Sequence, residues 1–136
     1  MTAARYLLDT NICICIHRQR PTKVMQRFQK LRPGEAVISV VTWGELLYGA
    51  EKSREQNMAL ERLQEFTTLI PVLPLPIVAG HAYGSIRAAL EMRGTPIGNN
   101  DLWIAAHAKS ENLTLVTNNE REFRRVAGLR IQNWTS

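Results

Sequence analysis

The sequence predicts an α/β protein with a three-layer α/β/α architecture and a mostly parallel central sheet of about five strands. Two observations support this fold class. Short apolar segments rich in β-branched residues alternate along the chain with longer segments whose apolar residues recur at helical spacing. Strands that alternate with helices pair in parallel, because each helix provides a crossover to the next strand. The chain has 136 residues and contains no repeat or low-complexity linker, so residues 1–136 are expected to form a single domain.

The first part of the chain, up to residue 50, predicts two strands and three helices. An apolar strand at residues 5–8 precedes a helix that opens at a Thr-Asn pair, since both residue types favour helix starts. A second helix is expected over residues 21–32, with a proline at its start and Pro-Gly after its end. The sequence AVISV at residues 36–40 is typical of a buried strand, and a helix is expected over residues 42–50.

The later part of the chain continues the alternation. Apolar residues keep helical spacing in three segments, and the long middle helix ends at Gly-Thr-Pro. One short strand lies between prolines, which favours an edge of the sheet. Helices are therefore expected at residues 57–69, 78–90 and 101–110 and in NNEREF, and strands at 72–73, 113–117 and 129–131.

The charge balance favours a polyanionic partner. The chain has 17 Lys and Arg against 12 Asp and Glu, which gives a net charge of +5 and a pI near 9.7. Prolines interrupt LIPVLPLPIV, the most apolar later stretch, so no membrane helix is expected. Cys13 and Cys15 are two positions apart on a helix and cannot readily pair. We therefore expect a cytoplasmic protein whose two thiols stay reduced.

Carboxylates recur where the expected strands end. Asp9 follows the first strand directly, Glu45 is placed in the first turn of the helix after AVISV, and Asp101 in the first turn after PIGNN. Glu122 follows LTLVT by a few residues. Because parallel strands end at one edge of the sheet, all these carboxylates are expected at the same crevice.

A structural explanation exists for each acidic residue taken alone. Thr42 and Glu45 match a helix-capping box, and Asp101 and Glu122 suit the positive end of a helix dipole. Several carboxylates at one edge repel each other, however, and a basic chain has no general need for such a cluster. A hard divalent cation such as Mg²⁺ or Mn²⁺ would neutralise them and could activate water for attack on a phosphodiester. Metal-dependent cleavage of a nucleic acid therefore explains both the acids and the basic surface.

Basic residues crowd the early helices and the C-terminal part of the chain. Solvated helix faces and contacts with phosphates explain these clusters equally well. Arg87, Arg121 and Arg124 are the candidates for contact with RNA or with a protein inhibitor.

Four segments resemble, in order, the motifs of PIN-domain ribonucleases. These segments are LLDTN, TWGELLYGAEKS, GTPIGNNDLWIAAHA and LVTNNEREFRRVAGLRIQNW. The resemblance covers essentially the whole chain and is strongest to the VapC toxins of type II (VapBC) toxin–antitoxin modules. It implies one PIN domain over residues 1–136.

The resemblance also implies an activity and its partners. It implies a Mg²⁺- or Mn²⁺-dependent endoribonuclease that cleaves structured RNA, usually as a homodimer, and is inhibited by a VapB antitoxin. Members with this motif pattern typically cut the anticodon stem-loop of initiator tRNA. The family's catalytic acids match Asp9, Glu45, Asp101 and Glu122, of which Asp9 and Asp101 are expected to hold the metal.

The sequence departs from the family pattern at one position. Many PIN domains have an aspartate near the position of Asn119, whereas here the carboxylate arrives later, as Glu122. Asn119 and Asn11 are therefore expected in supporting roles, with helix capping the simplest role for Asn11.

Two rival functions compete with this interpretation. A haloacid-dehalogenase-type phosphatase requires a second aspartate two residues after Asp9, and the chain has Asn11 there. A catalytically inactive PIN-fold RNA-binding or scaffold protein remains the main alternative, although such a protein has no use for a set of repelling carboxylates.

Overall fold

A computed structural model describes residues 3–136, and its core is a five-stranded sheet in which all neighbouring strands are parallel. The strand order is β3-β2-β1-β4-β5, so the proline-flanked β3 is an edge strand as predicted. The strands are β1 (Tyr6–Leu8), β2 (Ala36–Ser39), β3 (Val72–Leu73), β4 (Thr114–Val116) and β5 (Ile131–Gln132). The helices are α1 (Thr10–Arg18), α2 (Thr22–Gln29), α3 (Val40–Glu51), α4 (Gln56–Leu69), α5 (Val78–Met92), α6 (Asn99–Ser110) and α7 (Glu120–Phe123).

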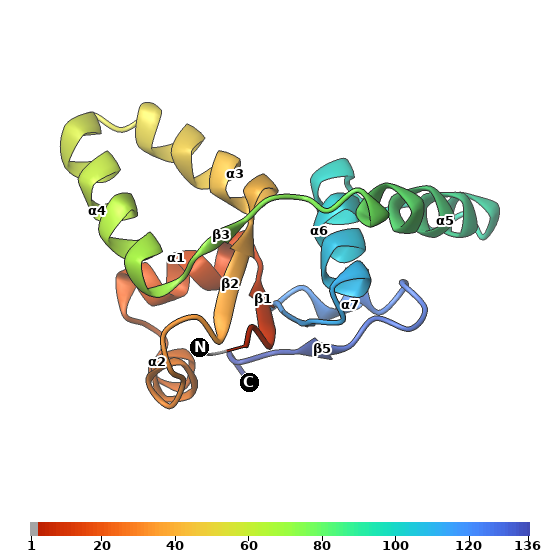
Figure 1. The fold of residues 1–136 in the computed structure, drawn as a ribbon, viewed down its shortest axis with the longest axis horizontal. Helices are drawn as coiled ribbons and strands as arrows, with labels where there is room; N and C mark the ends of the chain where they lie inside the picture. Colours follow the sequence, from red (N-terminus) through yellow and green to blue (C-terminus); the bar gives the residue numbers. More distant parts are fainter. Residues whose placement is uncertain (1–2) are drawn as a thin grey trace.

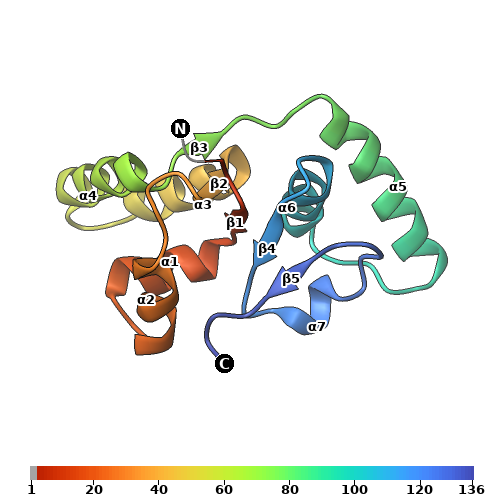
Figure 2. The same ribbon diagram turned by 60° about the horizontal axis from the view of Figure 1, so that its bottom comes forward.

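The sheet separates two apolar layers, which confirms the predicted α/β/α architecture. In β1, Leu7 packs into one layer, while its neighbours Tyr6 and Leu8 pack into the other. Alternate residues of a strand point to opposite faces, so each central strand contributes to both layers. Helices α5 and α6 cover one face, and α1 and α2 cover the other; Figures 1 and 2 show these helices on opposite sides of the strands.

Most element boundaries differ from the prediction by one to three residues, and two of these differences concern the strands β2 and β5. Strand β2 ends at Ser39 rather than Val40, because the Ser39 hydroxyl accepts a hydrogen bond from the Val41 amide (3.1 Å) and starts α3 there. The last strand lies at Ile131–Gln132 instead of residues 129–131. Each of these two differences is within two residues of the prediction, and only the first changes the interpretation of a candidate site residue.

Two other expectations can be compared with residues 3–136. Both cysteines are free thiols, and Cys13 is buried in the layer formed by α1. No helix within these residues is long and apolar enough to cross a membrane.

Candidate active site

The candidate site lies where the carboxyl ends of the central strands meet. Asp9 follows β1 directly, α3 starts immediately after β2, and Thr117 follows β4. Since the three strands are adjacent and parallel, these segments begin at the same edge of the sheet. Asp101 reaches the same region from the first turn of α6.

Asp9 has two structural partners, one for each carboxylate oxygen. Its Oδ1 accepts a hydrogen bond from the Ile12 amide (2.9 Å), so Asp9 is the N-cap of α1. Its Oδ2 accepts a short hydrogen bond from the hydroxyl of Thr117, which is itself fully buried. Asp9 is only 6% exposed, and this burial raises its pKa even though both hydrogen bonds oppose the rise. Capping and a buried acidic site are therefore combined in one side chain.

Glu45 does not belong to a capping box, and that expectation is wrong. The cap of α3 is Ser39, so Glu45 lies in the second turn of the helix instead of the first. Its carboxylate accepts a hydrogen bond from the Thr10 hydroxyl (2.7 Å) across the gap between α3 and α1. The first residue of α1 therefore orients Glu45, whereas the sequence favoured a capping role for Thr10.

Asp101 and Glu122 form a hydrogen-bonded pair of carboxyl groups. Burial, the hydrogen bond with Glu122 and the charge of Glu122 together raise the pKa of Asp101 to about 7. Two carboxyl groups can hydrogen-bond only if one of them carries a proton, so this contact favours the protonated form of Asp101. The charges of Glu45 and Asp9 also raise the pKa of Asp101. All the other predicted acids therefore act electrostatically on Asp101.

Glu122 is oriented by its neighbours in the way predicted for a supporting amide. The side-chain amide of Asn119 donates to Glu122 Oε2 (2.6 Å), and the Gly98 amide donates to Oε1 (3.2 Å). The Asn119 backbone N–H in turn donates to the Thr117 hydroxyl (2.9 Å). Asn11 lies exposed in the first turn of α1, and its backbone N–H is directed toward Asp9.

The carboxylates suit a hard divalent cation. Within residues 3–136, no three acidic, histidine or cysteine side chains lie together as a complete metal-binding cluster. Mg²⁺ does not require one, because it usually binds one or two protein carboxylates and completes its coordination with waters and substrate phosphates. The raised pKa of Asp101 reflects burial and the negative charge of its neighbours, which a bound cation would offset. The carboxylate oxygens at this edge therefore fit a hard divalent cation.

The predicted RNA-contacting arginines are placed unequally. Arg87 on α5 donates to Glu91 (2.8 Å) and to the Tyr83 hydroxyl (2.9 Å), and Arg124 donates to Glu120 (3.1 Å). Arg121 is exposed on α7, one residue before Glu122. Arg121 is therefore the candidate cation that lies nearest in sequence to the acids.

Sequence analysis did not identify Thr117 as a site residue. Its position held a usable signal, because it directly follows a buried strand that ends at the same edge as β1. The hydroxyl donates to Asp9 and accepts from the backbone N–H of Asn119. Because the Asn119 side chain donates to Glu122, Thr117 connects the Asp9 side of the site with the Glu122 side.

An apolar groove extends from the acidic edge between α1, α3 and α4. It has a volume of about 420 Å³ and begins at Thr10 and Glu45. Leu46, Leu63 and Phe66 contribute apolar side chains farther along. The groove therefore adjoins the candidate site at Thr10 and Glu45.

Comparisons with known proteins agree on the family. The family model described as "PIN domain" matches residues 6–129. The chain is 45% identical to the tRNA(fMet)-specific endonuclease VapC of Shigella flexneri and to Ribonuclease VapC2 of Haemophilus influenzae, over 96% of this chain and 98% of each relative. Among solved structures, it resembles DNA-bound VapBC from Salmonella typhimurium, with a TM-score of 0.90, 40% identity, and coverage of 96% of this chain and 98% of that chain. The chain belongs to the PIN-domain family and, within it, to the VapC ribonucleases.

Thr117→Val should lower the stability of the protein while preserving side-chain shape. The substitution removes the hydroxyl that donates to buried Asp9 and accepts from the backbone N–H of Asn119. The loss of these hydrogen bonds should lower the free energy of unfolding by about 1–3 kcal/mol. Urea unfolding would measure the change in the free energy of unfolding, with Thr114→Val, at the start of β4, as the matched control. Equal stability of both variants would show that the Thr117 bonds contribute nothing.

The stability of the metal-free protein should fall as pH rises from about 4 to about 7. Asp101 has a raised pKa in the folded state, so the folded protein binds more protons than the unfolded chain in this range. The stability advantage is complete below the unfolded pKa of 3.8 and is lost as pH passes about 7. Asp101→Asn should remove this dependence and be more stable than wild type at pH 8. Thermal melting of both proteins at pH 5 and pH 8 in the presence of a chelator would test this prediction. The same change in melting temperature with pH for wild type and Asp101→Asn would contradict it.

Proposed function

We propose that this protein is a Mg²⁺- or Mn²⁺-dependent endoribonuclease toxin of a VapBC module. The observation that carries the proposal is the set of carboxyl groups at the carboxyl edge of the sheet, where burial and the neighbouring acids raise the pKa of Asp101 to about 7. Repulsion among these groups lowers the stability of the fold, and such an arrangement is typical of a functional site that binds a positively charged group. The two VapC relatives at 45% identity, named as a ribonuclease and a tRNA endonuclease, support RNA as the substrate.

Each acidic residue has a proposed role that follows from its surroundings. Asp9 and Asp101 hold the divalent cation, and Glu45 completes the site directly or through water. Glu122 supports the opposite side, with Asn119 holding its carboxylate. When bound, the cation lowers the pKa of a coordinated water and offsets charge on the phosphate. The hydroxyls of Thr10 and Thr117 fix the directions of Glu45 and Asp9, so that little reorganisation is needed when RNA arrives.

We propose initiator tRNA as the RNA substrate. One relative at 45% identity is named a tRNA(fMet)-specific endonuclease, and the net charge of +5 suits a long polyanion. Exposed Arg121 next to Glu122 is the first candidate for a phosphate contact near the scissile bond. Because RNA of this kind is cytoplasmic, we place the activity in the cytoplasm.

A VapB antitoxin is the proposed inhibitor, and the groove beside the acids is its proposed binding surface. The solved relatives include VapBC assemblies from Rickettsia felis and Salmonella typhimurium. The groove starts at Thr10 and Glu45, so a segment bound along it would cover the edge where RNA must approach. We further propose that the toxin forms a homodimer, as the family resemblance implies.

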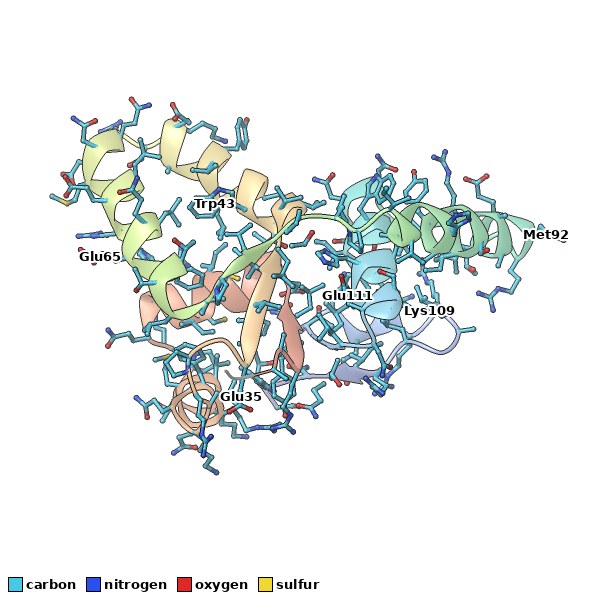
Figure 3. All side chains as sticks on the ribbon, viewed as in Figure 1. Glu35, Trp43, Glu65, Met92, Lys109 and Glu111 are labelled. Carbon is cyan, nitrogen blue, oxygen red and sulfur yellow. The ribbon has the colours of Figure 1, made fainter. Side chains whose placement is uncertain are left out.

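Asp101→Asn should abolish RNA cleavage, with a loss of about 10²-fold or more, because the neutral amide is a poor ligand for a divalent cation. Glu65→Gln is the control, since Glu65 lies exposed on the outer side of α4 (Figure 3). Cleavage of purified initiator tRNA would be followed by sequencing of the RNA ends.

The same assay tests the chemistry. A chelator should stop cleavage by wild-type protein and added Mg²⁺ or Mn²⁺ should restore it, with 5′-phosphate and 3′-hydroxyl products. Activity in the chelator, or a 2′,3′-cyclic phosphate product, would contradict the metal-dependent mechanism. Absence of cleavage by metal-loaded wild type would favour the inactive RNA-binding alternative.

Gly49→Phe should release the toxin from its antitoxin without loss of activity. Gly49 lines the groove on α3, and a Cβ atom added there meets no other atom within 4 Å, so an aromatic side chain can start from this position and occupy part of the groove. Antitoxin affinity should fall by about tenfold or more, corresponding to about 1.4 kcal/mol. Gly80→Phe on α5, also free of close neighbours, is the control. Calorimetry with VapB would measure both; unchanged affinity of Gly49→Phe would place the antitoxin elsewhere.

A further inference from the structure

Tyr83 on α5 contacts α6 on both sides of Asp101 in the sequence. Its ring stacks on Trp103, with ring centroids 4.0 Å apart and an interplanar angle of 17°. Its hydroxyl donates a hydrogen bond of 2.5 Å to Asn99 Oδ1. One side chain thus holds the residue two positions before Asp101 and the residue two positions after it.

The tyrosine hydroxyl is itself held in one orientation. Arg87 Nη1 donates to the Tyr83 oxygen (2.9 Å), and Arg87 Nε is bonded to Glu91 (2.8 Å) on the next turn of α5. Because the arginine occupies a lone pair of the hydroxyl oxygen, the hydroxyl proton is directed to Asn99. A chain of hydrogen bonds therefore runs from Glu91 through Arg87 and Tyr83 to Asn99, the first residue of α6.

Helix geometry makes these contacts relevant to Asp101. Asn99 and Trp103 are four positions apart and share one face of α6, whereas Asp101 lies about 200° around the axis from Asn99. Side-chain ends lie about 5–6 Å from a helix axis, so a rotation of about 10° moves a carboxylate by about 1 Å. A displacement of that size at a catalytic group can cost about 10²-fold in rate.

The start of α6 has no side-chain cap of its own. Gly98 at its N-cap position provides no side-chain hydrogen bond. Farther along, Leu102, Ile104 and Ala105 are buried in the core. The contacts of Tyr83 with Asn99 and Trp103 therefore act at the end of α6 that carries Asp101.

We infer that Tyr83 is a positioning residue that sets the rotation of α6 and thereby aims the Asp101 carboxylate at the proposed metal site. The inference rests on the proposed function, because Asp101 is assigned its role there. It extends the site to a second helix, α5, whose hydroxyl and aromatic contacts act through α6 and do not touch substrate. It also gives Arg87 a role inside the chain, as the residue that orients the Tyr83 hydroxyl.

Tyr83→Phe tests the inference, because it removes the hydroxyl and keeps the ring on Trp103. We expect kcat for initiator tRNA to fall about tenfold with KM unchanged, and Mn²⁺ affinity measured by calorimetry to weaken by a similar factor. Tyr48→Phe is the matched control, since Tyr48 is an exposed tyrosine on α3. It should match wild type in both measurements.

A double-mutant cycle with Asn99→Ala separates direct coupling from a general loss of stability. The single and double variants should lose kcat and Mn²⁺ affinity to the same extent, because each breaks the same bond. The inference would be overturned if the losses of kcat and Mn²⁺ affinity were additive, or if Tyr83→Phe had wild-type values. It would also be overturned if the loss of kcat in Tyr83→Phe disappeared well below the melting temperature. The Mn²⁺ measurement needs no RNA. If wild type fails to cleave RNA, the proposed function fails, while the effect of Tyr83→Phe on Mn²⁺ binding still decides this inference.

Discussion

Repulsion among the carboxyl groups at the carboxyl edge of the sheet is the constraint on which the rest of this structure depends. A parallel sheet brings the ends of β1, β2 and β4 to one edge, and the chain places acids after or near each of them. At this partly buried edge, where the effective dielectric constant is low, the protonated form of Asp101 is favoured up to about pH 7. The fold must supply enough hydrogen bonds to hold these side chains in place without the cation that would neutralise them.

Those hydrogen bonds come from hydroxyl and backbone donors. Thr117 and the Ile12 amide hold Asp9, and Thr10 holds Glu45. Glu122 receives donors from Asn119 and Gly98. None of these donors carries a formal charge, so the edge keeps its negative potential. A lysine or arginine in the same positions would satisfy the carboxylates and would also remove the need for a metal ion.

The sequence predicted the fold well because its signals are local. Apolar periodicity and the Pro and Gly residues between segments placed every strand and helix within a few residues, and the alternation of the two predicted a parallel sheet. The acids were predicted to converge because parallel topology converts position after a strand into position at one edge. The placement of Glu45 was wrong by one helical turn, because Ser39 and Thr42 are equally good caps by residue type and only packing selects between them.

Contacts between helices were beyond prediction for a related reason. The pairing of Tyr83 with Asn99 and Trp103 depends on how α5 lies across α6, and that is set by the core between Ile86, Leu90 and Leu102. No spacing rule within one segment contains this information.

The two halves of the acidic edge are supported in different ways, and this difference has a functional consequence. Asp9 is anchored by the rigid end of β1 and by its own cap, so its position is fixed as soon as the sheet forms. Asp101 stands on a helix end with no side-chain cap, and the residues on either side of it in the sequence are contacted by Tyr83 of α5. The position of Asp9 therefore depends on the sheet, whereas the position of Asp101 depends on how two helices pack against each other. A cation held by both of these proposed ligands would require the sheet edge and the α5–α6 pair to be correctly placed at the same time, so cation binding would report on helix packing as well as on the acids themselves.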